Sequence, residues 1–363
     1  MPSVTRSALL SLTWQGQLED YVTAIAWSPN NRQVAIASAA GEVLLVDSKT
    51  RQTVSLQTAT GASINCLGFC HDGCFLAAGG QSGQVQVWQI HLDADPVLQL
   101  NLEHQRTWVD QLAWNPTANE LAFGLGRYAQ VWEIPAGNLV ATLPFETSSI
   151  LGLAWHPQGT HLALSGNQGV KVWPRTDWDA DPVVREMTAA GMSLTVSPDG
   201  RLMASGNLDR TLLVWPWESD DPWQMQGFPG KVRHLAWSAA YFKPKWADAA
   251  QILATASMAN VVVWRRHPDA DQEWLPEVLH GHEAEVRAIA FQPGQSLLAS
   301  ADAEGQLCLW QQGTHLVQRL RDLKQGFTGL SWSPQGDRLA AGGEHGEWFI
   351  WQASRRGQGF SKR

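Results

Sequence analysis

The feature that most constrains this chain is a unit of about 25 residues that recurs along its length. One copy spans residues 286–310. It contains three short apolar runs, separated by a Pro-Gly turn and by an Asp/Glu/Gly turn, and it ends in Trp310. Runs of this length joined by tight turns are typical of β-strands and not of helices. The unit therefore predicts three antiparallel strands.

The same pattern occurs eight times in the 363 residues. The copies span residues 22–47, 64–88, 109–132, 150–173, 192–215, 232–264, 286–310 and 327–351. Further strand-like pieces lie between them, such as residues 52–58 and 139–143. Each period thus predicts about four strands. Such a sheet cannot bury both of its faces alone, so the copies are expected to stack on one another.

The unit resembles the WD40 repeat. The resemblance rests on the aromatic-Ser-Pro turn (Trp27-Ser28-Pro29 and Trp332-Ser333-Pro334), the Leu298-Ala299-Ser300 second strand and the terminal Trp, and it covers about residues 7–351. It implies an all-β chain folded as a β-propeller, with one four-stranded blade per repeat around a channel. Eight copies predict eight blades, and seven blades with an extra hairpin are the alternative. Residues 1–351 are expected to form a single propeller, and residues 352–363 a short, basic and disordered tail.

The resemblance also implies a polar network of His, Ser, Asp and Trp within a repeat, and most copies here lack it. The copy at 286–310 comes closest, with Glu in place of Asp (His282, Ser300, Glu304 and Trp310). The copy at 192–215 keeps three of the four (Ser205, Asp209 and Trp215). Most blades are therefore expected to depend on apolar packing, in which many of the 20 Trp residues take part.

A strand-like piece at residues 8–14 precedes the first full copy, and only a short tail follows the last one. In a closed ring this piece would supply the outer strand of the last blade by pairing with residues 347–351. Closure would remove an open sheet edge that otherwise invites aggregation.

Antiparallel order places the loops between first and second strands on one face, together with the loops after third strands. This is the bottom face, and the remaining loops form the top face. Four loops after third strands hold eleven of the 34 acidic residues (91–96, 177–182, 218–223 and 269–274). Blades four to six add Trp residues that the repeat does not require. The predicted partner-binding residues of this face are Trp178, Asp179, Asp181, Trp217, Asp220, Asp221, Trp223, Trp246, Asp271 and Trp274.

Aromatic side chains within an acidic rim favour a protein-binding site, because Trp often dominates interface energetics. The acidic rim favours a partner of basic character. The alternative is that these loops are solvated turns and that the Trp side chains cover outer strands.

The top face offers Arg106 and Trp108 before blade three. Near the mouth of the channel they could hold a peptide or an anionic group. The alternative is that Trp108 fills space between blades. An enzyme or small-ligand site at the same mouth would need clustered acid, base or metal groups. The candidates come from different blades (His104, Asp110, His234, His282 and Glu285).

The remaining chemistry is sparse. Cys66, Cys70, His71 and Cys74 form the only metal-like cluster in the sequence. Cys66 lies four strand residues from Cys70, about 13 Å away, which is too far for one closed zinc site. These thiols are expected to pack in the blade. The sequence contains no Gly-x-Ser-x-Gly elbow, phosphate-binding loop or His-Glu-x-x-His motif. It therefore predicts no catalytic residue, metal or cofactor, and favours a non-catalytic scaffold for protein partners.

Charge and cysteine content limit the class of partner and the cellular location that the sequence favours. The net charge of −8 argues against a broad nucleic-acid surface, which would need Lys and Arg. Four Cys residues do not make a disulfide framework, and the N-terminus is a poor signal peptide. No apolar run is long enough to span a membrane. A cytoplasmic protein, monomeric by itself, is expected.

Overall fold

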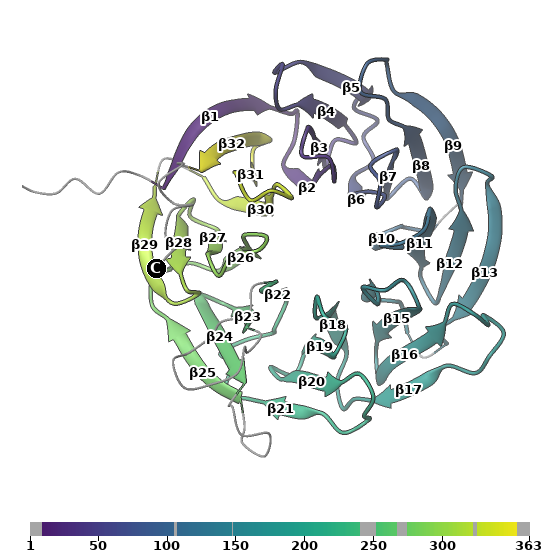
Figure 1. Ribbon diagram of the computed structural model, residues 1–363, viewed down its shortest axis with the longest axis vertical. Coiled ribbons are helices and arrows are strands. Elements are labelled where there is room, and N and C mark those ends of the chain that lie inside the picture. The colour runs from purple at the N-terminus through teal and green to yellow at the C-terminus, as the bar shows by residue number, and fades with distance from the viewer. Residues whose placement is uncertain are drawn as a thin grey trace, which may run out of the picture.

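The computed structural model describes residues 9–104, 107–146, 148–239, 252–266, 274–321 and 325–353. These residues form eight four-stranded antiparallel sheets, arranged as blades around a central axis (Figure 1). Eight blades confirm the predicted propeller, and the seven-blade alternative is wrong.

The blades follow one another along the chain, and each runs from its inner strand to its outer strand. Blade 1 contains β2 (Val22–Trp27), β3 (Gln33–Ser38), β4 (Val43–Asp47) and β5 (Thr53–Gln57). Blade 2 contains β6 (Ile64–Phe69), β7 (Phe75–Gly80), β8 (Gln84–Gln89) and β9 (Val97–Glu103). Blade 3 contains β10 (Leu112–Trp114), β11 (Glu120–Leu125), β12 (Tyr128–Glu133) and β13 (Asn138–Pro144). Blade 4 contains β14 (Gly152–Trp155), β15 (His161–Gly166), β16 (Gly169–Pro174) and β17 (Val183–Glu186).

The second half of the ring is built in the same way. Blade 5 contains β18 (Gly191–Val196), β19 (Leu202–Asn207), β20 (Leu212–Pro216) and β21 (Trp223–Met225). Blade 6 contains β22 (His234–Trp237), β23 (Ile252–Ser257), β24 (Asn260–Arg266) and β25 (Trp274–Leu279). Blade 7 contains β26 (Val286–Phe291), β27 (Leu298–Asp302), β28 (Leu307–Gln311) and β29 (His315–Leu320). Blade 8 contains β30 (Phe327–Trp332), β31 (Arg338–Gly343), β32 (Glu347–Ala353) and, from the start of the chain, β1 (Leu10–Gln17).

The N-terminal strand closes the ring, as the sequence predicts. β1 pairs antiparallel with β32, with Leu10 opposite Ala353 and Gln17 opposite Glu347. The strand extends three residues beyond the expected end at Trp14. The ring of Trp14 packs edge-on against Trp348, with 5.0 Å between centroids. The last blade is therefore completed by residues from the opposite end of the chain.

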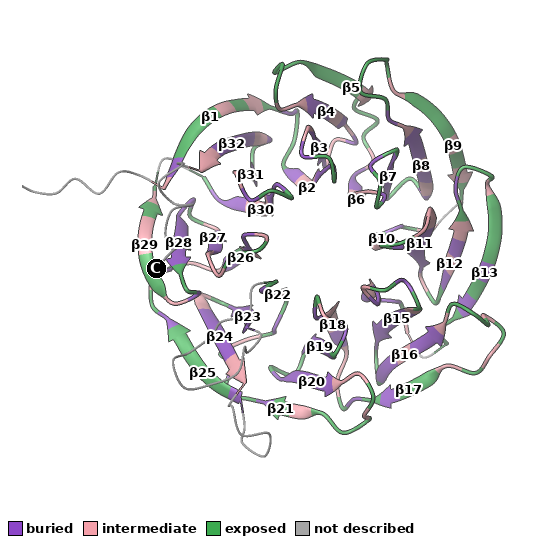
Figure 2. Ribbon diagram, in the orientation of Figure 1, coloured by how far each residue is buried: buried purple, intermediate pink, exposed green. Residues whose placement is uncertain are grey.

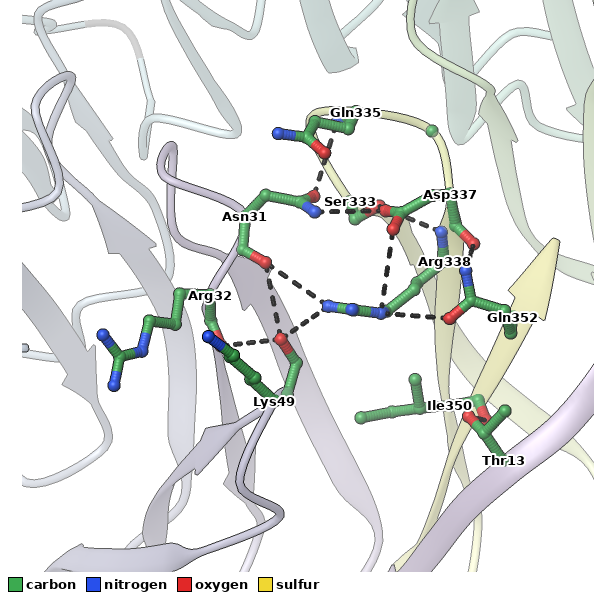
Figure 3. A network of polar contacts seen from close by, with 12 residues as sticks. Thr13, Asn31, Arg32, Lys49, Ser333, Gln335, Asp337, Arg338, Ile350 and Gln352 are labelled. Atoms are coloured by element: carbon green, nitrogen blue, oxygen red, sulfur yellow. Dashed lines mark hydrogen bonds and ion pairs between the residues drawn. The ribbon is translucent and has the colours of Figure 1, made fainter. Parts of the chain in front are cut away.

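A second set of contacts closes the same joint on the bottom face (Figure 3). Asn31 of blade 1 donates from Nδ2 to Asp337 of blade 8, at 3.1 Å. Arg338 of blade 8 donates from Nη1 to the hydroxyl of Ser48 in blade 1, at 2.6 Å. Although partial burial alone would raise it, the hydrogen bonds from Ser333 and Asn31 hold the pKa of Asp337 below its usual value. The joint thus depends on charged hydrogen bonds as well as on strand pairing.

Burial follows the order of the strands within each blade. The second strands β3, β7, β19 and β23 are buried at every residue, whereas the outer strands are largely exposed (Figure 2). Small residues such as Ala and Ser fill these second strands because they lie between two neighbouring blades. In β27 and β31, Ala299 and Ala340 occupy comparable buried positions. Because the strands pack against neighbouring blades, the loops are the parts of the fold that are accessible to a partner.

Trp residues at the ends of inner strands connect successive blades. Four of them donate from Nε1 to a backbone carbonyl of the preceding blade's inner strand, at 2.8–3.2 Å (Trp27 to Ser331, Trp114 to Gly68, Trp155 to Ala113 and Trp332 to Ala290). These hydrogen bonds explain why Trp recurs here: its ring fills the space between blades while its N–H satisfies a carbonyl.

The residue after each inner strand is buried in all eight blades. Five are Ser or Cys, and three are longer polar residues (Ser28, Cys70, Ser197, Ser238, Ser333, Asn115, His156 and Gln292). Cys70 replaces the turn serine: its Sγ lies 2.9 Å from Asp72 Oδ1 and accepts from the amide of Phe75 at 3.0 Å. Burial raises the pKa of the Cys70 thiol to about 12. Cys66 is buried as well, so these two thiols pack in the blade as expected, whereas Cys74 is exposed.

The polar network of blade 7 differs from the prediction in one residue. His282 Nδ1 lies 2.7 Å from a carboxylate oxygen of Asp302, and its Nε2 lies 2.6 Å from Ser300 Oγ. Asp302, and not Glu304, is therefore the acidic member. Asp302 ends the buried strand β27, and its second oxygen accepts the amides of Glu304 and Gln306, at 3.0 Å each. The turn wraps around Asp302 and leaves Glu304 exposed.

Candidate partner-binding surfaces

The bottom face of blades 4 and 5 carries a group of exposed carboxylates. Two neighbouring loops, β16–β17 and β20–β21, present six exposed acidic residues (Asp177, Asp179, Asp181, Glu218, Asp220 and Asp221). Arg185 lies 3.5 Å from Asp220, while Arg175 is occupied by a two-oxygen contact with Glu120. Few cations therefore compensate these loops, and the surface is negatively charged at neutral pH.

The Trp side chains beneath these loops are packed against the blades. Trp217 is half-buried, with ring centroids 4.5 Å from His156 and 5.6 Å from His161. The guanidinium of Arg185 lies over the Trp217 ring at 5.7 Å from its centroid. Trp178 is also half-buried and packs edge-on against Trp155, at 5.9 Å. Each ring leaves only part of its surface to solvent.

Blades 5 and 6 bury their additional aromatics further. Trp274 is 5% exposed and lies between Trp223 and Trp237, 6.2 Å from each. The guanidinium of Arg266 covers Trp223 at 4.9 Å. Trp274 is thus a core residue and cannot serve as the exposed aromatic that the sequence suggested, because its ring packs between blades 5 and 6. Trp246 and Asp271 lie outside the described residues. For the remaining residues of this set, partner binding stays a prediction.

On the top face, in contrast, the side chain of Trp108 is exposed to solvent. Trp108 is 58% exposed, more than any other large apolar side chain in the part of the chain that the structure describes. With Asp110, Gln111 and Ser149 it lines a pocket of about 380 Å³ between blades 3 and 4. This exposure disfavours the alternative that Trp108 fills space between blades. Arg106 lies outside the described residues.

The groups considered for chemistry at the channel mouth do not form one site. Asp110 accepts a hydrogen bond from Asn65 at 2.6 Å and lies by Trp108. His282 is buried in the network of blade 7. His234 is near Glu285, and burial together with the neighbouring Arg233 lowers the pKa of its imidazole to about 4. The described residues contain no group of three or more His, Cys, Asp or Glu side chains that could hold a metal ion. Among them, no helix has the length and apolarity needed to cross a membrane.

Comparisons with known proteins agree with this architecture, which is that of a β-propeller of repeated four-stranded blades. The model of the anaphase-promoting complex subunit 4 WD40 domain matches residues 9–72. The model of the WD domain, G-beta repeat, matches residues 137–174, 189–216, 274–311 and 316–352. Together these matches cover more than half of the chain. The chain belongs to the WD40 repeat family.

Individual relatives are distant. THO complex subunit 3 of Arabidopsis thaliana is 25% identical over 62% of this chain and 67% of its own length. Protein HIR1 of Cryptococcus neoformans is 27% identical, and the match covers 44% of this chain and 20% of HIR1. The B-type cell cycle switch protein ccs52A of Medicago truncatula is 25% identical over 78% of this chain and 58% of its own length. The chain thus spans less than two thirds of the latter two.

Solved structures match over nearly the whole chain. Sqt1 of Chaetomium thermophilum, bound to the N-terminus of the ribosomal protein L10, has a TM-score of 0.78 at 20% identity, covering 92% of this chain and 97% of Sqt1. The computationally designed protein Ika8 has a TM-score of 0.72 at 21% identity, covering 93% and 97%. At these identities the likeness shows the fold.

Proposed function

We propose that this chain is a non-catalytic platform that binds a protein partner and that Trp108 on the top face is its principal anchor. The observation that carries the proposal is the exposure of Trp108 beside a pocket. A Trp left largely in water gains apolar burial when a partner covers it, and such residues often dominate binding energy. The related fold of Sqt1 holds the N-terminus of another protein, which supports a similar use of this one.

The acidic loops of blades 4 and 5 are the second candidate surface. Their six exposed carboxylates favour a basic segment, and the half-buried rings of Trp178 and Trp217 could stack on Lys or Arg side chains. Binding there should weaken steeply with salt, because exposed charges are screened. Binding at Trp108 should depend less on salt.

We also propose that the chain acts in the cytoplasm as a monomer. All four cysteines are free thiols, which suits a reducing compartment.

One experiment separates the two surfaces. The tagged chain and its variants are used to capture partners from native lysate across a salt series. Trp108→Ala removes the top anchor, with Tyr21→Ala as control, since Tyr21 is 43% exposed on the top face of blade 1. Asp179→Lys with Asp181→Lys reverses the bottom charge. Its control is Asp93→Lys with Asp95→Lys, in the same Asp-Ala-Asp-Pro sequence of blade 2.

We expect a defined partner that wild type and both controls retain and that Trp108→Ala loses. Loss only in the Asp179 and Asp181 variant would move the site to the bottom face. A folded wild-type protein that retains no partner at low or moderate salt would refute the platform.

A further inference from the structure

The inner strands share a structural irregularity at their top ends. In five blades the pairing of the inner strand with the second strand shifts, which leaves one residue unpaired as a bulge (Thr23, Asn65, Met192, Arg287 and Thr328). Sequence alignment of the repeats places Asp110, Leu151 and Arg233 at the same position in the other three blades. Bulges re-aim side chains and are common beside functional sites. Two neighbouring blades, 6 and 7, both carry Arg at this position.

These two arginines lie at a cavity of about 330 Å³ formed by the inner strands of blades 5 to 8. Its polar lining is Arg233, Arg287, His234, Ser193, Thr195 and Thr328. Ser193 Oγ and Thr328 Oγ1 are buried and have no hydrogen-bond partner among the described residues. Because both oxygens are buried, an occupant of the cavity cannot reach them without a side-chain rotation, and the charged donors that the cavity offers are the two guanidiniums.

The charge at the cavity is positive although the whole chain is negative. Arg287 Nη2 lies 3.2 Å from Glu285, whereas Arg233 is exposed and has no ion pair in the described part of the chain. Two guanidiniums therefore face one carboxylate. Burial is the main cause of the low pKa of His234, near 4, so its imidazole is neutral at pH 7 and offers hydrogen bonding without charge.

We propose that this axial cavity binds a phosphate group through Arg233 and Arg287. A phosphate monoester has three strong acceptor oxygens and carries about 1.5 to 2 negative charges at pH 7, which suits two guanidiniums. A carboxylate carries one negative charge and two acceptor oxygens, so two guanidiniums attract it less strongly. Two sources share the chemistry, namely a free phosphate ion and a phosphorylated residue of a partner chain. The cavity shares no lining residue with the Trp108 pocket. Phosphate binding can therefore be tested on the purified chain without a protein partner.

Calorimetric titration of the purified chain tests the proposal. The probes are inorganic phosphate and one short peptide in three forms, carrying phosphoserine, serine or aspartate at its centre. The test variant is Arg233→Gln with Arg287→Gln. The matched control is Arg127→Gln with Arg210→Gln, which removes the same charge from exposed loops of the same face outside the cavity.

We expect wild type and control to bind a phosphate probe equally and the test variant to bind it at least about tenfold more weakly, given two lost charged hydrogen bonds. Ser193→Ala with Thr328→Val, which changes no charge, is a second control and should leave binding unchanged, because both hydroxyl oxygens are buried. Tighter binding of the phosphoserine peptide than of inorganic phosphate assigns the group to a partner chain, and the reverse assigns it to a free ion.

Three results would overturn the proposal. They are no binding of either phosphate probe by wild type, equal binding by wild type and the Arg233 and Arg287 variant, or an aspartate peptide bound as tightly as its phosphoserine form. A melting temperature equal to that of wild type shows that a variant is folded. Partner capture through Trp108 can fail or succeed without affecting any of these results.

Discussion

Blades 5 and 7 have the same fold but treat their central Trp differently. In blade 7, Trp310 Nε1 donates to Ser300 Oγ at 2.8 Å, and the hydroxyl lies within hydrogen-bond distance of His282. In blade 5, Trp215 is fully buried and its Nε1 has no hydrogen-bond partner among the described residues. In blade 7 the Trp N–H is therefore part of a hydrogen-bonded network, whereas in blade 5 it has no acceptor among the described residues.

The cause lies in the side chains that surround the shared serine. Ser205 of blade 5 donates to Asn207 at 2.8 Å, and Asn207 in turn donates to Thr211 at 2.9 Å. This local network is complete without a His and does not include Trp215. A blade therefore tolerates one unsatisfied N–H where apolar packing is dense, because the ring itself supplies most of the stabilisation.

The largest expected effect is the loss of the ring in blade 5. Trp215→Ala should lower the free energy of unfolding by about 3–5 kcal/mol, because it removes a fully buried aromatic and leaves a cavity. Urea denaturation of the variant and of wild type measures this change in the free energy of unfolding. Trp108→Ala is the control, since its exposed ring should change stability by less than about 0.5 kcal/mol. A loss below about 1 kcal/mol for Trp215→Ala would contradict dense packing in this blade.

The second test asks which acid belongs to the blade 7 network. Asp302→Ala should cost about 1–3 kcal/mol, because it leaves His282 and two backbone amides without their acceptor. Glu304→Ala is the matched control and should cost less than about 0.5 kcal/mol, since that side chain is exposed. Thermal or urea denaturation of both variants measures the difference. The reverse order would restore Glu304 as the acidic member.

The same blade shows where sequence reasoning succeeds and where it stops. The spacing of apolar runs and Trp residues was sufficient for eight blades and for closure by the N-terminal strand, since burial repeats with a fixed period. It could not distinguish Asp302 from Glu304, because two acids two residues apart lie in one tight turn. That choice depends on which carboxylate the turn amides enclose.

The candidate surfaces were harder to predict for a similar reason. Trp274 and Trp108 are both Trp residues near strand ends, yet one is 5% and the other 58% exposed. Exposure depends on neighbours from other strands, here Trp223 and Trp237 around Trp274, which no local pattern encodes. Arg233 and Arg287 occupy the same position in the aligned repeats, but only the folded structure shows that both line one cavity.

A smaller effect isolates the Trp N–H itself. Trp310→Phe and Trp215→Phe both remove the indole nitrogen and shrink the ring. Trp310→Phe also removes the donor to Ser300, whereas Trp215→Phe eliminates an unsatisfied group. We expect Trp310→Phe to be the more destabilising by about 1 kcal/mol in urea denaturation. Equal losses would mean that the Trp310 hydrogen bond adds no net stability.

The smallest expected effect is a difference in pH dependence. Burial lowers the pKa of His282 below its usual value of about 6.5, although the hydrogen bond to Asp302 opposes this shift. Below that pH the unfolded chain binds a proton that the folded blade resists, so His282 makes stability fall as pH decreases from about 7 to 5. His282→Gln should be less stable throughout but should show a shallower decline.

Blade 5 provides the control, because it has no His in its network. Trp215→Phe should keep the wild-type slope, including the contribution of His234, whose pKa is also lowered by burial. Urea denaturation at several pH values from 5 to 8 measures the slopes. If His282→Gln and wild type declined in parallel, the imidazole of blade 7 would not be held neutral by burial.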